Sequence, residues 1–112
     1  MVFVAVILLV CAISLGIYLI SFLIQNKETP KGVAFIHGSF AFLGVVTLAL
    51  LAIKLNSLLW ISVLFLLAAA AGGFYMMFRD LVNRVIPKWL VLAHVCVAVV
   101  GVVTALLIIF KR

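Results

Sequence analysis

Four long apolar runs account for nearly the whole chain. They cover about 2–24, 33–53, 58–78 and 89–110. Each has about the twenty residues that a helix needs to cross a hydrocarbon core of roughly 30 Å at about 1.5 Å per residue. Of the 112 residues, 71% are hydrophobic and 9% are charged, which is outside the range of a soluble domain. Any chemistry must therefore take place in the bilayer or at its edges.

The two halves of the chain repeat one another, without a gap, at a spacing of 57 residues. Because each copy, 1–55 and 58–112, has two spans, both hairpins should cross the membrane in the same direction, related by a pseudo-two-fold axis along the membrane normal. We therefore expect an all-α integral membrane four-helix bundle of two tandem hairpins, forming a single transmembrane domain, 1–112. The shared residues are a Pro-Lys pair, a histidine, an alanine and a Gly-Val-Val-Thr run: Pro30-Lys31, His37, Ala41 and Gly44–Thr47 return as Pro87-Lys88, His94, Ala98 and Gly101–Thr104.

The charges indicate orientation. The net charge of +6 is confined to the loops and the C-terminus, so we expect no nucleic-acid partner. Five cations near the first and third loops outnumber three on the other side, which predicts that these two loops are cytoplasmic. We expect an integral protein of a bacterial inner membrane.

The first apolar run lacks the basic n-region and the small-residue cleavage site of a signal peptide, so we expect it to be retained.

His37 and His94 are the only histidines, and both lie inside long apolar runs. A metal-competent imidazole is costly in a membrane, so it suggests a functional site. The second and fourth helices of an up-down bundle lie diagonally opposite, and helix spacings of about 8–10 Å leave roughly 11–14 Å between them. That diagonal has room for one metal ion between two imidazoles. Zinc needs three or four protein ligands, whereas haem needs only two axial ligands.

Small residues follow each histidine on the same helix face and predict a slot for a flat macrocycle, although small residues also mediate ordinary helix packing. They are Ala41 and Gly44 after His37, and Ala98 and Gly101 after His94.

Residues at the same level in the other helices complete the predicted site. The spacing places Tyr18 with His37, and Tyr75 with His94, as candidate partners of an imidazole or of a cofactor edge, with a position at the membrane interface as the alternative. Gly16 and Gly73, two residues earlier, would allow a close approach. Haem propionates would meet the cations near the first and third loops, which otherwise serve as positive-inside flanks: Lys31, Lys88, Arg79, Lys27 and Arg84.

Several other classes of site are disfavoured. The only acids, Glu28 and Asp80, lie at loop level, so the chain lacks the embedded glutamate of the small multidrug-resistance transporters, which are of similar length. No embedded carboxylate could orient a histidine for hydrolase chemistry. Cys11 and Cys96 lie at different depths, so we expect no disulfide between them.

Two in-membrane histidines on different helices, each followed by a glycine on the same face, resemble the small four-helix transmembrane b-type cytochromes. The resemblance implies one haem b held by His37 and His94, and electron transfer with a quinone or another membrane redox partner. Quinone or superoxide oxidoreduction at the haem edge stays open. Many members hold two haems on four histidines. This chain can hold one per monomer, or share haems within a homo-oligomer.

Two non-redox alternatives remain open. The histidines of a small transporter or structural subunit could hydrogen-bond across the bundle. A pH-sensing or proton-relay channel could use imidazoles that titrate near neutrality, but the chain lacks the further polar residues that such a relay would need.

Overall fold

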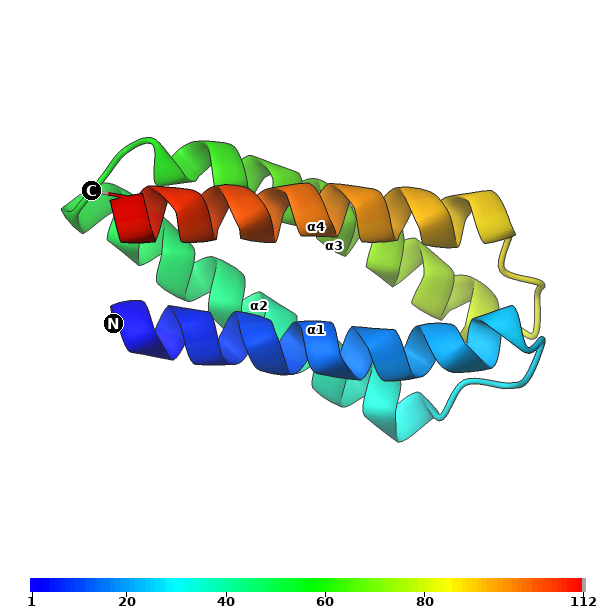
Figure 1. The fold of residues 1–112 in the computed structure, drawn as a ribbon. Helices are drawn as coiled ribbons and strands as arrows, with labels where there is room; N and C mark the ends of the chain where they lie inside the picture. Colours follow the sequence, from blue (N-terminus) through cyan, green and yellow to red (C-terminus); the bar gives the residue numbers. More distant parts are fainter. Residues whose placement is uncertain (112) are drawn as a thin grey trace.

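Four α-helices make up the computed structural model, which describes residues 1–111 (Figure 1). They are α1 (Val2–Ile24), α2 (Lys31–Lys54), α3 (Leu59–Leu81) and α4 (Lys88–Lys111), and all are long and apolar enough to cross a membrane. The predicted all-α four-helix architecture is confirmed. Helix ends extend up to three residues beyond the apolar runs, because long charged side chains can continue a helix at an interface while their charges reach water.

The ends of α1 and α3 share one cap. Asn26 and Asn83 have φ of 56° and 59°, a left-handed conformation that asparagine tolerates. The next residue in each loop donates its N–H back into the last turn, Lys27 to the Phe22 carbonyl at 2.9 Å and Arg84 to the Arg79 carbonyl at 2.8 Å. This pattern is a Schellman motif. The repeated Asn-Lys and Asn-Arg pairs thus end both helices in the same way.

The helices follow one another around the bundle, so that α2 and α4 are diagonally opposite, as predicted. The α1–α2 and α3–α4 hairpins make the most extensive contacts, α2 and α3 make fewer, and α1 and α4 make the fewest of the neighbouring pairs. The start of α1 and the end of α4 lie at the same end of the bundle as loop 55–58, while loops 25–30 and 82–87 lie at the opposite end (Figure 1).

Buried side chains gather in one half of the bundle, next to loop 55–58. Among the described residues 1–111, every buried one falls within 5–12, 44–69 or 101–109, and none of residues 13–43 or 70–100 is buried. We call the first part the core half and the second the histidine half, because His37 and His94 lie in it. The largest fully buried side chains of the core half include Leu48, Leu51 and Leu59.

Glycines bring helices together within the core half. A Cβ on Gly44 would lie 3.0 Å from Leu9 Cδ2, and one on Gly101 would lie 2.9 Å from Leu66 Cγ. The Ser62 hydroxyl also donates a buried hydrogen bond to the Gly101 carbonyl. Since lipid offers no hydrophobic force between helices, this close contact and hydrogen bonding hold the bundle together.

Candidate functional site

The two histidines meet inside one subunit. His37 on α2 and His94 on α4 approach across the diagonal, with ring centroids 6.5 Å apart and ring planes at 74°. Both side chains are half-buried. The pair therefore joins the two copies of the repeat at one depth in the bundle.

Each imidazole is held by a backbone carbonyl of its own hairpin. His37 Nδ1 lies 2.8 Å from the Ala12 oxygen, and His94 Nδ1 lies 2.8 Å from the Ala69 oxygen. A carbonyl oxygen accepts hydrogen bonds and donates none, so Nδ1 carries the proton in both bonds. In the neutral ring the lone pair is then on Nε2, which is left as the candidate ligand atom.

Glycine explains why these carbonyls are accessible in the middle of a helix. The Ala12 carbonyl lies beneath position 16, one turn later, and the Ala69 carbonyl lies beneath position 73. Gly16 and Gly73 expose them, since a Cβ there would lie 3.1 Å from His37 Cε1 and 3.3 Å from His94 Cε1. The close approach predicted at these glycines is thus made by the imidazoles themselves. A further contact with a cofactor stays a prediction.

The slot predicted beside each histidine is occupied, at its glycine, by side chains of a neighbouring helix. Gly44 packs against Leu9, and Gly101 packs against Leu66 and Phe65. The helix-packing alternative therefore describes both glycines in this structure. Ala41 and Ala98, one turn closer to the imidazoles, are half-buried, and a cofactor contact for them stays a prediction.

The tyrosines do not hydrogen-bond the imidazoles in this structure, and a contact with a cofactor edge stays a prediction. Tyr18 and Tyr75 are 50% and 49% exposed. Each comes two residues after the glycine that faces a histidine, a rotation of about 200° around the helix, so it points to the outside. Tyr75 instead accepts a hydrogen bond from an Arg79 terminal nitrogen at 3.2 Å, and the guanidinium lies 5.7 Å from the centre of its ring.

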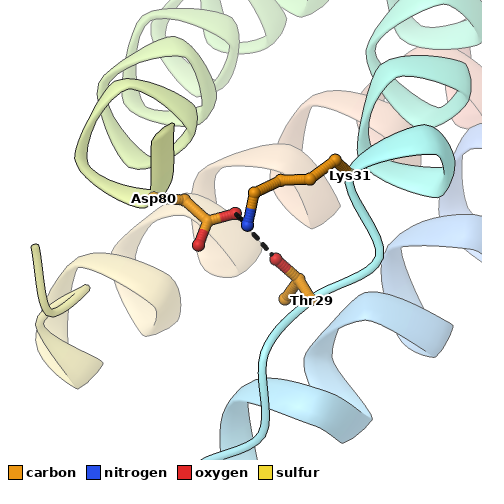
Figure 2. Close-up of polar contacts among 3 residues, drawn as sticks. All are labelled: Thr29, Lys31 and Asp80. Atoms are coloured by element: carbon orange, nitrogen blue, oxygen red, sulfur yellow. Dashed lines mark hydrogen bonds and ion pairs between the residues drawn. The ribbon is translucent and has the colours of Figure 1, made fainter. Parts of the chain in front are cut away.

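The predicted cations differ in their surroundings. Lys31 forms an ion pair of 3.0 Å with Asp80, to which Thr29 also donates a hydrogen bond (Figure 2). Arg79 Nε donates to the Val85 carbonyl at 2.7 Å. Lys88 has no acidic partner within residues 1–111. A propionate-binding role for these residues stays a prediction, and Lys88 is one of the cations that form no ion pair in the described part of the chain.

Residues other than the histidines offer little for a metal. Within residues 1–111, no group of three or more His, Cys, Asp or Glu side chains could hold a metal ion. Cys11 and Cys96 are both free, as predicted. The two imidazoles are the potential metal ligands that the structure brings together in this part of the chain.

The carbonyls of Ala12 and Ala69 were not among the residues predicted from the sequence. The sequence does carry a signal for these two carbonyls, because each alanine precedes a repeated glycine by four residues.

Comparisons with protein-family models, curated proteins and solved structures find no match to this chain. We therefore infer the function from the geometry of the site.

Proposed function

We propose that this chain is a membrane haem b protein in which His37 and His94 are the two axial ligands. Its role would be electron transfer between a membrane carrier such as a quinone and a redox partner near loops 25–30 and 82–87. The observation that carries the proposal is the meeting of the two imidazoles, with ring centroids 6.5 Å apart, within one subunit.

The separation of the rings suits a shared metal. An ion bound about 2 Å from a nitrogen of each imidazole, the length typical of metal–histidine bonds, would separate the ring centres by roughly 6 Å. The hydrogen bonds of Nδ1 to Ala12 and Ala69 fit as well. Metal-binding histidines usually donate their other N–H to a carbonyl or carboxylate, which fixes the tautomer and the orientation of the ring.

The histidine half could accommodate a macrocycle with a smaller loss of packing energy than the core half. None of its residues is buried, so parting its helices would break fewer close contacts than a similar movement around Leu48. The core half would keep the four helices together during such a movement.

The residues around the proposed site would bind the haem and orient its ligands. The two imidazoles would hold the haem, and Gly16 and Gly73 keep the carbonyls that orient the imidazoles within reach. A haem b held by both imidazoles would supply a one-electron couple, which favours electron transfer over oxygen chemistry.

Visible absorption tests this proposal. The full chain, expressed with an ample supply of haem and purified in mild detergent, should show a Soret band and sharp bands in the reduced state. His37→Ala and His94→Ala should each abolish or severely weaken this spectrum. Tyr75→Phe is the matched control and should keep it, because Tyr75 faces away from the imidazoles. A colourless wild-type protein, or a spectrum unchanged in both histidine variants, would refute the proposal.

A second candidate is a non-redox membrane subunit or small transporter in which the histidines are structural. The hydrogen bonds to Ala12 and Ala69 favour it, because they tie the helices of each hairpin together without a cofactor. In that case the purified protein would be colourless. His37→Ala and His94→Ala would then lower the free energy of unfolding by about 0.6 kcal/mol each, the average for a hydrogen bond between membrane helices.

A further inference from the structure

The pseudo-two-fold axis relates two seams of the bundle, one between α2 and α3 and one between α1 and α4. A polar cluster closes the α2–α3 seam at its loop end. There a single Asp80 oxygen lies 3.0 Å from Lys31 Nζ and 3.0 Å from the Thr29 hydroxyl (Figure 2). This cluster ties loop 25–30 and the start of α2 to the end of α3.

The equivalent positions of the α1–α4 seam cannot form that cluster. In the repeat, Leu23 takes the place of Asp80 and Ile86 takes the place of Thr29, while Lys88 matches Lys31. The lysine is thus kept in the second copy, but a leucine occupies the position of its acidic partner. Within the described residues 1–111, no carboxylate pairs with Lys88.

A groove of about 310 Å³ follows this seam. Its walls are apolar, with Ile20, Leu23 and Ile24 on α1 and Val91 and Leu92 on α4, and Lys88 lines its loop end. The groove therefore combines an apolar channel between two membrane helices with one unneutralised cation at the level of the lipid headgroups.

We propose that this groove binds one anionic phospholipid, with its phosphate at Lys88 and an acyl chain along the apolar walls. Charge complementarity supports this occupant, since a juxtamembrane lysine attracts anionic headgroups. A second copy of the chain would be a poor fit, because the chain carries only two acids and a net charge of +6. One of the two acids, Asp80, is already paired with Lys31. The proposal does not depend on haem binding.

Tryptophan fluorescence can report on the groove. The chain has two tryptophans, Trp60 and Trp89, so Trp60→Phe leaves one probe, next to Lys88. The full-length variant would be placed in phosphatidylcholine vesicles that contain a brominated lipid, either phosphatidylglycerol or phosphatidylcholine. Competition between brominated and ordinary lipid then gives the relative affinity of the site near Trp89.

The expected result is a roughly fivefold preference for the brominated anionic lipid, the effect of one lysine near a membrane surface. Lys88→Gln should abolish the preference, and Lys88→Arg should keep most of it. Arg84→Gln removes a cation from the same end of the bundle and should leave the preference unchanged. Leu23→Phe keeps the charge but narrows the groove, so it should weaken quenching by the anionic lipid.

Circular dichroism on each variant would confirm that helicity is kept. Equal quenching by the two lipids would overturn the proposal in favour of ordinary lipid contact. A preference that survives Lys88→Gln, or is lost equally in Arg84→Gln, would overturn it in favour of a diffuse positive surface. Weak quenching by both lipids, with self-association that depends on protein concentration, would show that a second copy covers the seam.

Discussion

The two halves of the bundle differ in packing, although each is built from both copies of the same repeat. The core half holds every buried residue of the part of the chain that the structure describes, including Leu48 and the closely packed Gly101 and Leu66. The histidine half has none, and its central contact is a pair of half-buried imidazoles. In lipid, helices associate through close packing. The comparison therefore indicates that one half supplies the stability, which leaves the other free to hold a polar site.

The largest difference should appear when a leucine is shortened in each half. Leu48→Ala removes a fully buried side chain and should lower the free energy of unfolding by about 2–3 kcal/mol, because it leaves a cavity. Leu19→Ala, at a half-buried position of the histidine half, should cost less than about 1 kcal/mol. Denaturation of the detergent-solubilised protein by SDS would measure both. Similar losses at the two sites would contradict the comparison.

Adding a methyl group should also lower the free energy of unfolding in the core half and not in the histidine half. A Cβ on Gly101 would lie 2.9 Å from Leu66 Cγ and 3.2 Å from Phe65 Cβ. Both atoms are close to the backbone and cannot easily move, so Gly101→Ala should cost about 1–3 kcal/mol. Gly38→Ala in the histidine half would meet nothing within 4 Å, and alanine is the better helix former. The same unfolding assay should show no loss for this control.

A methyl group at Gly16 should displace the His37 imidazole but change the free energy of unfolding only slightly. Its Cβ would lie 3.1 Å from His37 Cε1, so the ring must move away from the Ala12 carbonyl. We expect a loss of about 0.6 kcal/mol, the average for a hydrogen bond between membrane helices. The Nδ1 chemical shift in ¹⁵N NMR should change for His37, while that of His94 stays as in the wild type. An unchanged His37 shift would show that the glycine does not position the ring.

The smallest effect is expected at the Lys31–Asp80 ion pair. The two side chains are 42% and 19% exposed, so water and salt screen the interaction. Asp80→Asn should cost at most about 0.5–1 kcal/mol, and less as the salt concentration rises. Glu28→Gln is the control, because Glu28 forms no ion pair within residues 1–111, and it should have no effect. A larger loss would mean that the polar cluster contributes as much as a core contact.

The repeated sequence predicted much of the fold correctly. Four apolar runs predicted the four helices, and the repeat predicted that His37 and His94 lie at one depth on diagonal helices. Asn26 and Asn83 carry the signal for the two helix ends in their side chains, which tolerate a left-handed backbone. These features are local, or they follow from symmetry, so they can be recognised without a structure.

Only the tertiary structure decided what each helix face contacts. The helices are apolar on nearly all sides, and such a helix lacks the polar stripe that would show which face points inward. The Ala12 and Ala69 carbonyls, the outward Tyr18 and Tyr75, and the concentration of the core in one half all depend on the rotation of each helix against its neighbours. Close packing of all four helices sets that rotation. The sequence alone therefore determined which residues could meet, and the packing of the bundle decided which of them do.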